Sequence, residues 1–199
     1  MAYTPPPENT HTSLVEAMQK MDGVEFDLRL TADEQLVVHH DHTVSIPDEM
    51  LDGRSRIVEE WSLEDLEKVG FCSFEKLMSD RDWLIPWQEH SKVACLEIKR
   101  CLPKIEKDPT IRMSKIMEKA GFLIDEAGIP EQAAVFYAFH RPMAKVSKLS
   151  GSSRPWSRLL PVVPRTGSHN SKRLRASPEF IMYSFNRLLK SQKNSGAPM

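Results

Sequence analysis

Charged side chains alternate along two stretches of the sequence that are predicted to be strands. Because successive side chains of a strand point to opposite faces, Glu25 and Asp27 share one face of the first stretch. Glu97 and Lys99 share one face of the second stretch in the same way. Carboxylate oxygens are the ligands that hard cations prefer, so Glu25, Asp27 and Glu97 are predicted to bind Mg²⁺ or Ca²⁺. The alternative, for either strand taken singly, is the solvated face of a half-buried sheet.

Histidines cluster at the end of a second apolar stretch, residues 36–40. His40 is the candidate catalytic residue, because an imidazole can take a proton from an ester oxygen, or give one to it, near neutral pH. Asp41 is expected to turn the loop or to orient this ring. His39 alternates to the packing face and His42 follows the turn, so both are interpreted as bystanders. A zinc site is disfavoured, because three nearly consecutive histidines cannot all converge from one strand.

Four short motifs give this chain a family resemblance. They are Pro7-Glu8-Asn9-Thr10, the stretch from Glu25-Phe26-Asp27 to Thr31-Ala32-Asp33, His40-Asp41 after a valine strand, and Glu97-Ile98-Lys99. In this order they resemble the glycerophosphodiester phosphodiesterase family, whose pattern runs P-E-N-T, E-x-D-x-x-x-T-x-D, V-x-x-H-D and E-x-K. The resemblance covers residues 5–140, with thinner support to residue 165.

The resemblance implies a fold and an activity. The implied fold is an eight-stranded TIM-type barrel, and the implied reaction is metal-assisted hydrolysis of a small-molecule glycerophosphodiester to an alcohol and glycerol 3-phosphate. Glu25, Asp27 and Glu97 would hold the cation, His40 would move protons, and Lys99 would contact phosphate. From the residues alone, Lys99 could also be an ion-pair partner that neutralises Glu97, and both roles can hold at once.

The sequence departs from the family pattern at both ends. The family's first motif, H-R-G, supplies a second catalytic histidine and a phosphate-binding arginine, whereas no histidine precedes His11 here. His11 lies past the expected helix start at Asn9-Thr10, so it is not taken as a replacement. The W-T-x-N motif of the last barrel strands is also absent. At 199 residues, against about 250 for a typical barrel, the expected fold is α/β with an incomplete (β/α)8 barrel, and weak or no activity is expected.

Two other functions stay open at this point. A non-catalytic pseudoenzyme or partner-binding fragment would keep metal and phosphate affinity without turnover. A phospholipase D-like lyase on the same barrel would differ chiefly in the C-terminal part that is missing here. Codons for His-Arg-Gly, in frame upstream of Met1, would favour the hydrolase.

Hydrophobic periodicity and capping residues predict the elements that carry these side chains. Predicted helices cover 10–21, 109–120 and 141–149, with an apolar helical stripe at Leu63, Leu66 and Val69, and predicted strands cover 24–30, 36–40, 93–98, 133–138 and 159–163. This alternation is typical of an α/β fold. The tight link after strand 24–30 leaves the next strand antiparallel or diverging, whereas the resemblance implies neighbouring barrel strands.

Charge is distributed unevenly, although the net charge is only −1. Residues 141–199 carry twelve Lys and Arg against Glu179 alone, a balance of +11, which leaves −12 for residues 1–140. Residues 1–165 are predicted to form the partial barrel, and residues 166–199 a basic segment that contains one helix. Few aromatic residues are interleaved with its basic residues, so nucleic-acid binding is disfavoured against a solvated helix.

The remaining expectations concern location and association. No apolar run reaches the roughly 18 residues of a membrane helix, and no signal pattern opens the chain, so a soluble protein is expected. The 3 cysteines lack metal-type spacing, which suggests reduced thiols in a cytoplasmic protein. If the barrel lacks its first strand, an exposed edge of strand 24–30 would favour self-association.

Overall fold

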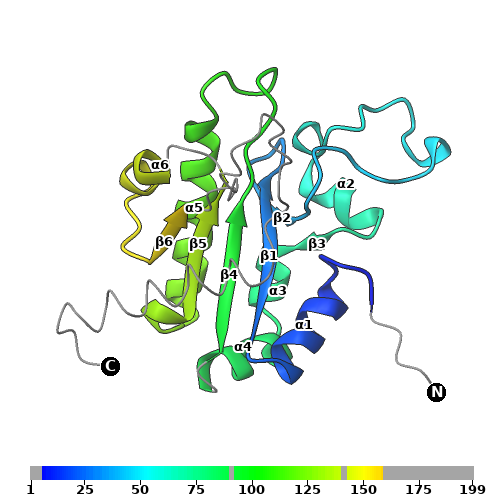
Figure 1. Ribbon diagram of the computed structural model, residues 1–199. Helices are drawn as coiled ribbons and strands as arrows, with labels where there is room; N and C mark the ends of the chain where they lie inside the picture. Colours follow the sequence, from blue (N-terminus) through cyan, green and yellow to red (C-terminus); the bar gives the residue numbers. More distant parts are fainter. Residues whose placement is uncertain (1–5, 90–91, 140–142, 159–199) are drawn as a thin grey trace, which may run out of the picture. The chain divides into compact units, whose positions relative to one another are not determined.

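The computed structural model describes residues 6–89, 92–139 and 143–158. These residues build one mixed sheet of six strands in the order β3-β2-β1-β4-β5-β6, with helices packed against it (Figure 1). The strands are β1 (Gly23–Leu30), β2 (Leu36–Val38), β3 (Cys72–Ser73), β4 (Val93–Ile98), β5 (Ala134–Ala138) and β6 (Trp156–Arg158). The α-helices are α1 (His11–Lys20), α2 (Leu63–Lys68), α3 (Phe74–Met78), α4 (Arg81–Glu89), α5 (Pro109–Glu126) and α6 (Met143–Ser150). The predicted α/β class is confirmed.

The centre of the sheet is parallel. β4 pairs in parallel with β1 on one side and with β5 on the other. The register sets Asp27 of β1 beside Glu97 of β4, and Glu97 beside Tyr137 of β5. Because side chains alternate, the polar side chains of these strands share one face, and Phe26 and Leu96 lie on the other. One face of the sheet therefore packs against the hydrophobic core, and the opposite face carries the charged and polar side chains.

β2 folds back on β1 as a tight hairpin. The pair is antiparallel, with Leu28 beside Val38 and Leu30 beside Leu36, and Thr31 N–H closes the turn by donating to Gln35 O at 2.9 Å. Of the two arrangements expected for β2, the antiparallel pairing with β1 is confirmed. β2 is therefore not the next parallel strand of a barrel. The prediction that this edge of β1 is exposed is wrong for residues 28–30, which pair with β2. The five-residue link between the two strands is too short for a crossover connection, so the chain turns back and pairs with the edge of β1.

The packing face of the sheet is covered by α1, α4 and α5 (Figure 1). The core contains Met18 from α1, Trp83 and Trp87 from α4, and Phe26 from β1, each with no exposed surface. Trp87 Nε1 also donates to Ala133 O at 2.9 Å, so even the polar atom of this buried ring is satisfied. This core fixes the position of the strands that carry the polar face.

Helix boundaries follow the capping residues. Thr10 caps α1 by accepting from Ser13 N–H at 3.2 Å, as the predicted start required. Asp108 caps α5, which continues past the predicted end at residue 120 to Glu126 because buried residues keep recurring at helical spacing. α4 contains a proline, Pro86. The predicted strand 159–163 and the basic segment 166–199 lie outside the described residues.

The loop between β2 and α2 carries the histidines and has its own small core. Val44, Val58, Trp61 and Leu66 pack together beneath it with Val37 of β2. Short 3₁₀ turns at Asp48–Met50 and Val58–Glu60, and a bridge between Thr43 and Ile57, tie the two limbs of the loop together. The loop is therefore held by packing at both ends, which gives the histidines defined positions.

Two further observations concern the sequence expectations. Among the described residues, no helix combines the length and the apolar composition that a bilayer crossing requires. Cys72, Cys95 and Cys101 are all free thiols, and burial raises the pKa of Cys72 and Cys95 to about 11. Such thiols are poor nucleophiles at neutral pH, which fits packing rather than chemistry.

Candidate active site

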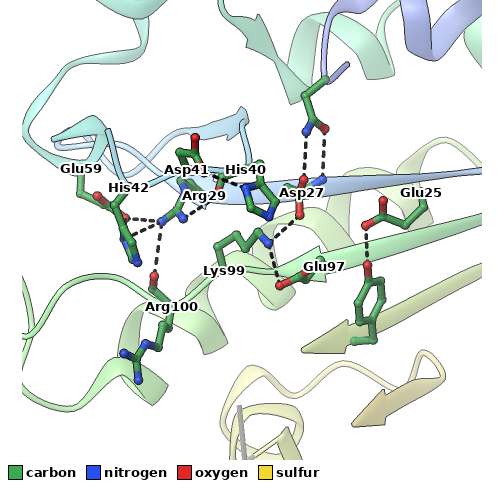
Figure 2. Close-up of polar contacts among 12 residues, drawn as sticks. Glu25, Asp27, Arg29, His40, Asp41, His42, Glu59, Glu97, Lys99 and Arg100 are labelled. Carbon is green, nitrogen blue, oxygen red and sulfur yellow. Dashed lines mark hydrogen bonds and ion pairs between the residues drawn. The ribbon is translucent and has the colours of Figure 1, made fainter. Parts of the chain in front are cut away.

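The polar face of the three parallel strands gathers the predicted site residues. Glu25 and Asp27 come from β1, and Glu97 comes from the adjacent β4, where it lies beside Asp27 (Figure 2). One carboxylate oxygen from each residue lies within 4.8 Å of the others. Asp27 and Glu97 are only 4% and 8% exposed, whereas Glu25 is the exposed member of the cluster. The structure thus brings together the three carboxylates that the sequence analysis selected.

Lys99 neutralises part of this cluster. Its Nζ lies 2.9 Å from Asp27 Oδ1 and 2.8 Å from Glu97 Oε1 (Figure 2). The Lys99 side chain is 11% exposed, so this is a largely desolvated pairing rather than a surface contact. The ion-pair interpretation of Lys99 matches this geometry, and its contact with phosphate stays a prediction.

Asn9 holds Asp27 from the other side. Asn9 Nδ2 donates to Asp27 Oδ2 at 2.9 Å, and Asn9 Oδ1 accepts from Asp27 N–H at 3.4 Å. Asn9 has a φ of 56°, a left-handed conformation that asparagine tolerates better than most residues. Sequence reasoning used Asn9 only as a helix-start signal, although its place in the P-E-N-T motif could have marked it as a supporting residue.

Tyr137 of β5 holds Glu25. The Tyr137 hydroxyl donates to Glu25 Oε1. Desolvation of the Glu25 carboxyl raises the pKa of Glu25 to about 7; the Tyr137 hydrogen bond opposes this rise, and the nearby Asp27 and Glu97 charges add to it. Burial and the same carboxylates raise the pKa of Tyr137, which stays a hydroxyl donor. The sequence analysis placed Tyr137 only within the predicted strand 133–138 and gave it no role.

His40 lies at the mouth of a cavity of about 340 Å³ next to the carboxylates. Its Nδ1 is 2.8 Å from Asp41 Oδ1, and both side chains are exposed. The contact with His40 lowers the pKa of Asp41, so Asp41 is an ionised acceptor at neutral pH. The cavity is lined by Arg29, His40, Asp41, His42, Glu97, Ile98, Lys99, Arg100, Ala138 and Phe139. Its volume falls in the range of small-molecule sites, roughly 300–1,000 Å³.

A buried ion pair that the sequence analysis missed lies beneath the histidines. Arg29 Nη1 donates to Glu59 Oε1 at 2.8 Å, and the two side chains are 3% and 2% exposed. Arg29 also donates through Nη2 to His40 O at 2.6 Å and through Nη1 to Arg100 O at 3.3 Å. Strand alternation puts Arg29 on the same face as Glu25 and Asp27, and this spacing could have identified Arg29 as a site residue. Its partner is thirty residues away, which spacing alone cannot identify.

The two remaining histidines differ from one another. His39 Nε2 lies 3.0 Å from Thr43 O and its ring packs on Phe71 at 4.8 Å between centroids, as expected for a structural residue. His42 was expected to be a bystander, but the structure places it in the cavity wall, with Nδ1 3.2 Å from Arg29 Nη1. The buried arginine draws the loop after the turn back toward the site.

Comparison with known proteins identifies a family that shares this sequence pattern. Residues 2–119 match the Glycerophosphoryl diester phosphodiesterase family. No curated protein sequence matches the chain.

Several solved structures share the fold. A glycerophosphodiester phosphodiesterase from Thermotoga maritima has 15% identity and a TM-score of 0.52, over 94% of this chain and 65% of that one. An Oleispira antarctica phosphodiesterase in complex with the product sn-glycerol-3-phosphate has 15% identity and a TM-score of 0.56, over 96% and 77%. A glycerophosphodiester phosphodiesterase from Parabacteroides distasonis has 16% identity and a TM-score of 0.53, over 96% and 72%. The described sheet is thus an incomplete form of their α/β barrel.

The family match extends over more than half of the sequence and includes the β1 carboxylates, the histidine loop and the β4 glutamate. The chain belongs to the glycerophosphoryl diester phosphodiesterase family.

Proposed function

We propose that the chain hydrolyses glycerophosphodiesters to an alcohol and glycerol 3-phosphate with the help of a divalent cation. The observation that supports this most directly is the convergence of Glu25, Asp27 and Glu97 beside the cavity that His40 lines. A phosphodiester needs charge stabilisation on its oxygens and a group that moves protons, and both are next to one another here. The family to which the chain belongs, and the product bound to the Oleispira antarctica phosphodiesterase, indicate the class of substrate.

The carboxylate cluster fits a hard cation. All three residues offer carboxylate oxygen, the donor that hard cations such as Ca²⁺ and Mg²⁺ prefer, and one oxygen from each residue lies within 4.8 Å of the others. Glu25, Asp27 and Glu97 would hold the ion, which would supply charge stabilisation at the phosphoryl oxygens. Lys99 and Tyr137 hold the carboxylates near this position.

We assign His40 as the proton-transfer residue. Because the Asp41 carboxylate can only accept, His40 carries its proton on Nδ1 in the neutral state and leaves Nε2 to exchange protons. Asp41 would orient the ring and stabilise its charged form, and Arg29 fixes the main chain at His40. Lys99, next to His40 in the cavity wall, would contact phosphate.

We expect the 199-residue chain to be a slow enzyme. His40 is the only proton-transfer histidine that we assign among the described residues, and loss of one such group typically costs about 10²- to 10⁴-fold. The second candidate is a binding protein without turnover, which the pairing of Lys99 with Asp27 and Glu97 favours because it already satisfies part of the cluster. Localisation in the cytoplasm, and self-association, stay expectations from the sequence.

The test combines an activity assay with calorimetry. Release of glycerol 3-phosphate from glycerophosphocholine is measured with Mg²⁺ and with Ca²⁺, and binding of each cation is measured by titration calorimetry. We expect Glu25→Gln to lose both, whereas the control Glu118→Gln, an exposed residue of α5, keeps both. Cation binding without turnover in the unsubstituted chain would favour the binding protein. Unchanged cation affinity in Glu25→Gln would contradict the assigned site.

A further inference from the structure

His42 packs against a charge pair that is closed to solvent. Its Nδ1 lies 3.2 Å from Arg29 Nη1 and 3.9 Å from Glu59 Oε1, while its side chain is 35% exposed and lines the cavity (Figure 2). Glu59 Oε2 is buried and has no hydrogen-bond partner among the described residues, so Arg29 is the group that satisfies this carboxylate. Arg29 Nη1, which also donates to Glu59 Oε1 at 2.8 Å and to Arg100 O at 3.3 Å, therefore presents an N–H donor to one edge of the His42 ring.

This contact fixes the protonation of His42. A guanidinium only donates hydrogen bonds, so His42 Nδ1 must be the unprotonated acceptor, and the ring proton must sit on Nε2 at the other edge. Desolvation and the nearby Arg29 charge lower the pKa of His42, with Glu59 opposing and the more distant Arg100 and Lys99 adding to this effect. His42 is thus a neutral imidazole with a fixed tautomer at neutral pH.

The two cavity histidines are therefore held in opposite tautomers. The Asp41 carboxylate places the proton of His40 on Nδ1, which leaves His40 Nε2 free to take or give a proton. Arg29 places the proton of His42 on Nε2, so Nε2 can act only as a hydrogen-bond donor. If His42 gave up this proton it would become an imidazolate, an anion far too basic to form in a proton-transfer step at neutral pH. His42 cannot share the role of His40.

We propose that His42 binds a non-bridging phosphoryl oxygen of the substrate through its Nε2–H, as a neutral hydrogen-bond donor positioned by the Arg29–Glu59 pair. This inference rests on the proposed function and adds a second phosphate-binding group to it. A neutral donor needs no compensating charge and stays a donor as the pH rises, and no bond to hydrogen breaks in its action.

The first test uses a series of substitutions. His42→Ala should lower kcat/KM for glycerophosphocholine by about 10²- to 10³-fold, the typical cost of one donor to a developing oxyanion. His42→Gln, which keeps an amide donor at similar reach, should stay within about tenfold of the unsubstituted chain. Both should keep the pH–rate profile of the unsubstituted chain. His11→Ala is the matched control, since His11 pairs with Asp80 and does not line this cavity.

The opposite result is equally clear. Equal losses in His42→Gln and His42→Ala, together with loss of one limb of the pH profile, would show proton transfer and overturn the donor role. Full activity in His42→Ala would overturn it as well. Circular dichroism and the unfolding midpoint of each variant separate a folding defect from a binding defect.

A second measurement does not depend on turnover. Nitrogen-15 spectra of histidine-labelled protein at pH 7 should show His42 as the neutral Nε2–H tautomer, and glycerol 3-phosphate should shift its Nε2 resonance. A charged ring, the Nδ1–H tautomer or an unshifted resonance would each overturn the inference. If the unsubstituted chain releases no glycerol 3-phosphate, the proposed function fails. A shifted His42 resonance in that chain would still support phosphate binding, so the two failures are distinguishable.

Discussion

The Arg29–Glu59 pair gives the sharpest prediction about stability. Glu59→Leu leaves the Arg29 charge at 3% exposure with only main-chain carbonyls and His42 as partners. Breaking a buried pair by removing one partner typically costs about 3–5 kcal/mol, because an uncompensated charge stays in a desolvated site. Arg29→Met should cost at least as much, since it leaves the Glu59 carboxylate unpaired and also frees the carbonyls of His40 and Arg100.

The double substitution separates charge from packing. Arg29→Met with Glu59→Leu leaves no unpaired charge and loses the hydrogen bonds of Arg29 to the carbonyls of His40 and Arg100 and to His42, at about 1 kcal/mol each. We therefore expect the double variant to be destabilised by about 3 kcal/mol, well below the sum of about 6–10 kcal/mol for the two singles. Since domains are stable by about 5–15 kcal/mol, the single variants should lie near the limit of folding.

The assay is equilibrium unfolding in urea, followed by tryptophan fluorescence and circular dichroism. The control is the exposed pair formed by Lys68 and Glu64 on α2, where the corresponding substitutions should hardly move the midpoint. The reasoning would be refuted by additive single and double effects, or by a loss below about 1 kcal/mol in Glu59→Leu. Either result would mean that Arg29 and Glu59 are solvated and do not hold the histidine loop.

The remaining predictions concern the carboxylate cluster. Because the pKa of Glu25 is raised to about 7 and the proposed cation would bind only the ionised carboxylate, cation affinity should rise between pH 6 and pH 8. Calorimetry at pH 6 in two buffers of different ionisation enthalpy should show proton release, and a pH-independent affinity would contradict the role of Glu25. Lys99→Met should strengthen cation binding, since it removes a positive charge 2.8–2.9 Å from Glu97 and Asp27, and should weaken binding of glycerol 3-phosphate. Parallel losses of both affinities would instead indicate a purely structural role for Lys99.

The sequence by itself determined what lies within one element. A strand's alternation places Glu25, Asp27 and Arg29 on one face whatever surrounds the strand, and the same rule joins Glu97 with Lys99. The start of α1 at Thr10 was equally local, because a cap needs only the residues of the first turn. These features depend on covalent geometry and on neighbours three or four residues away, so periodicity was sufficient to predict them.

Only the tertiary structure decided which elements meet. The parallel register of β1 and β4 is what sets Asp27 beside Glu97, and the return of the hairpin onto β1 could be stated from the sequence only as one of two arrangements. The contacts of Asn9 with Asp27, of Tyr137 with Glu25 and of Arg29 with Glu59 join residues 18, 112 and 30 positions apart.

The protonation of His42 depends on the last of these long-range contacts. Next to Arg29 its Nδ1 must accept, whereas the same residue in a solvated turn would titrate freely. Sequence spacing carries no information on burial or on partners that approach through space, and these two quantities set the tautomer and charge of a histidine. The candidate site residues were therefore readable along the chain, whereas the contacts that set their protonation states form only when the sheet and the loop come together.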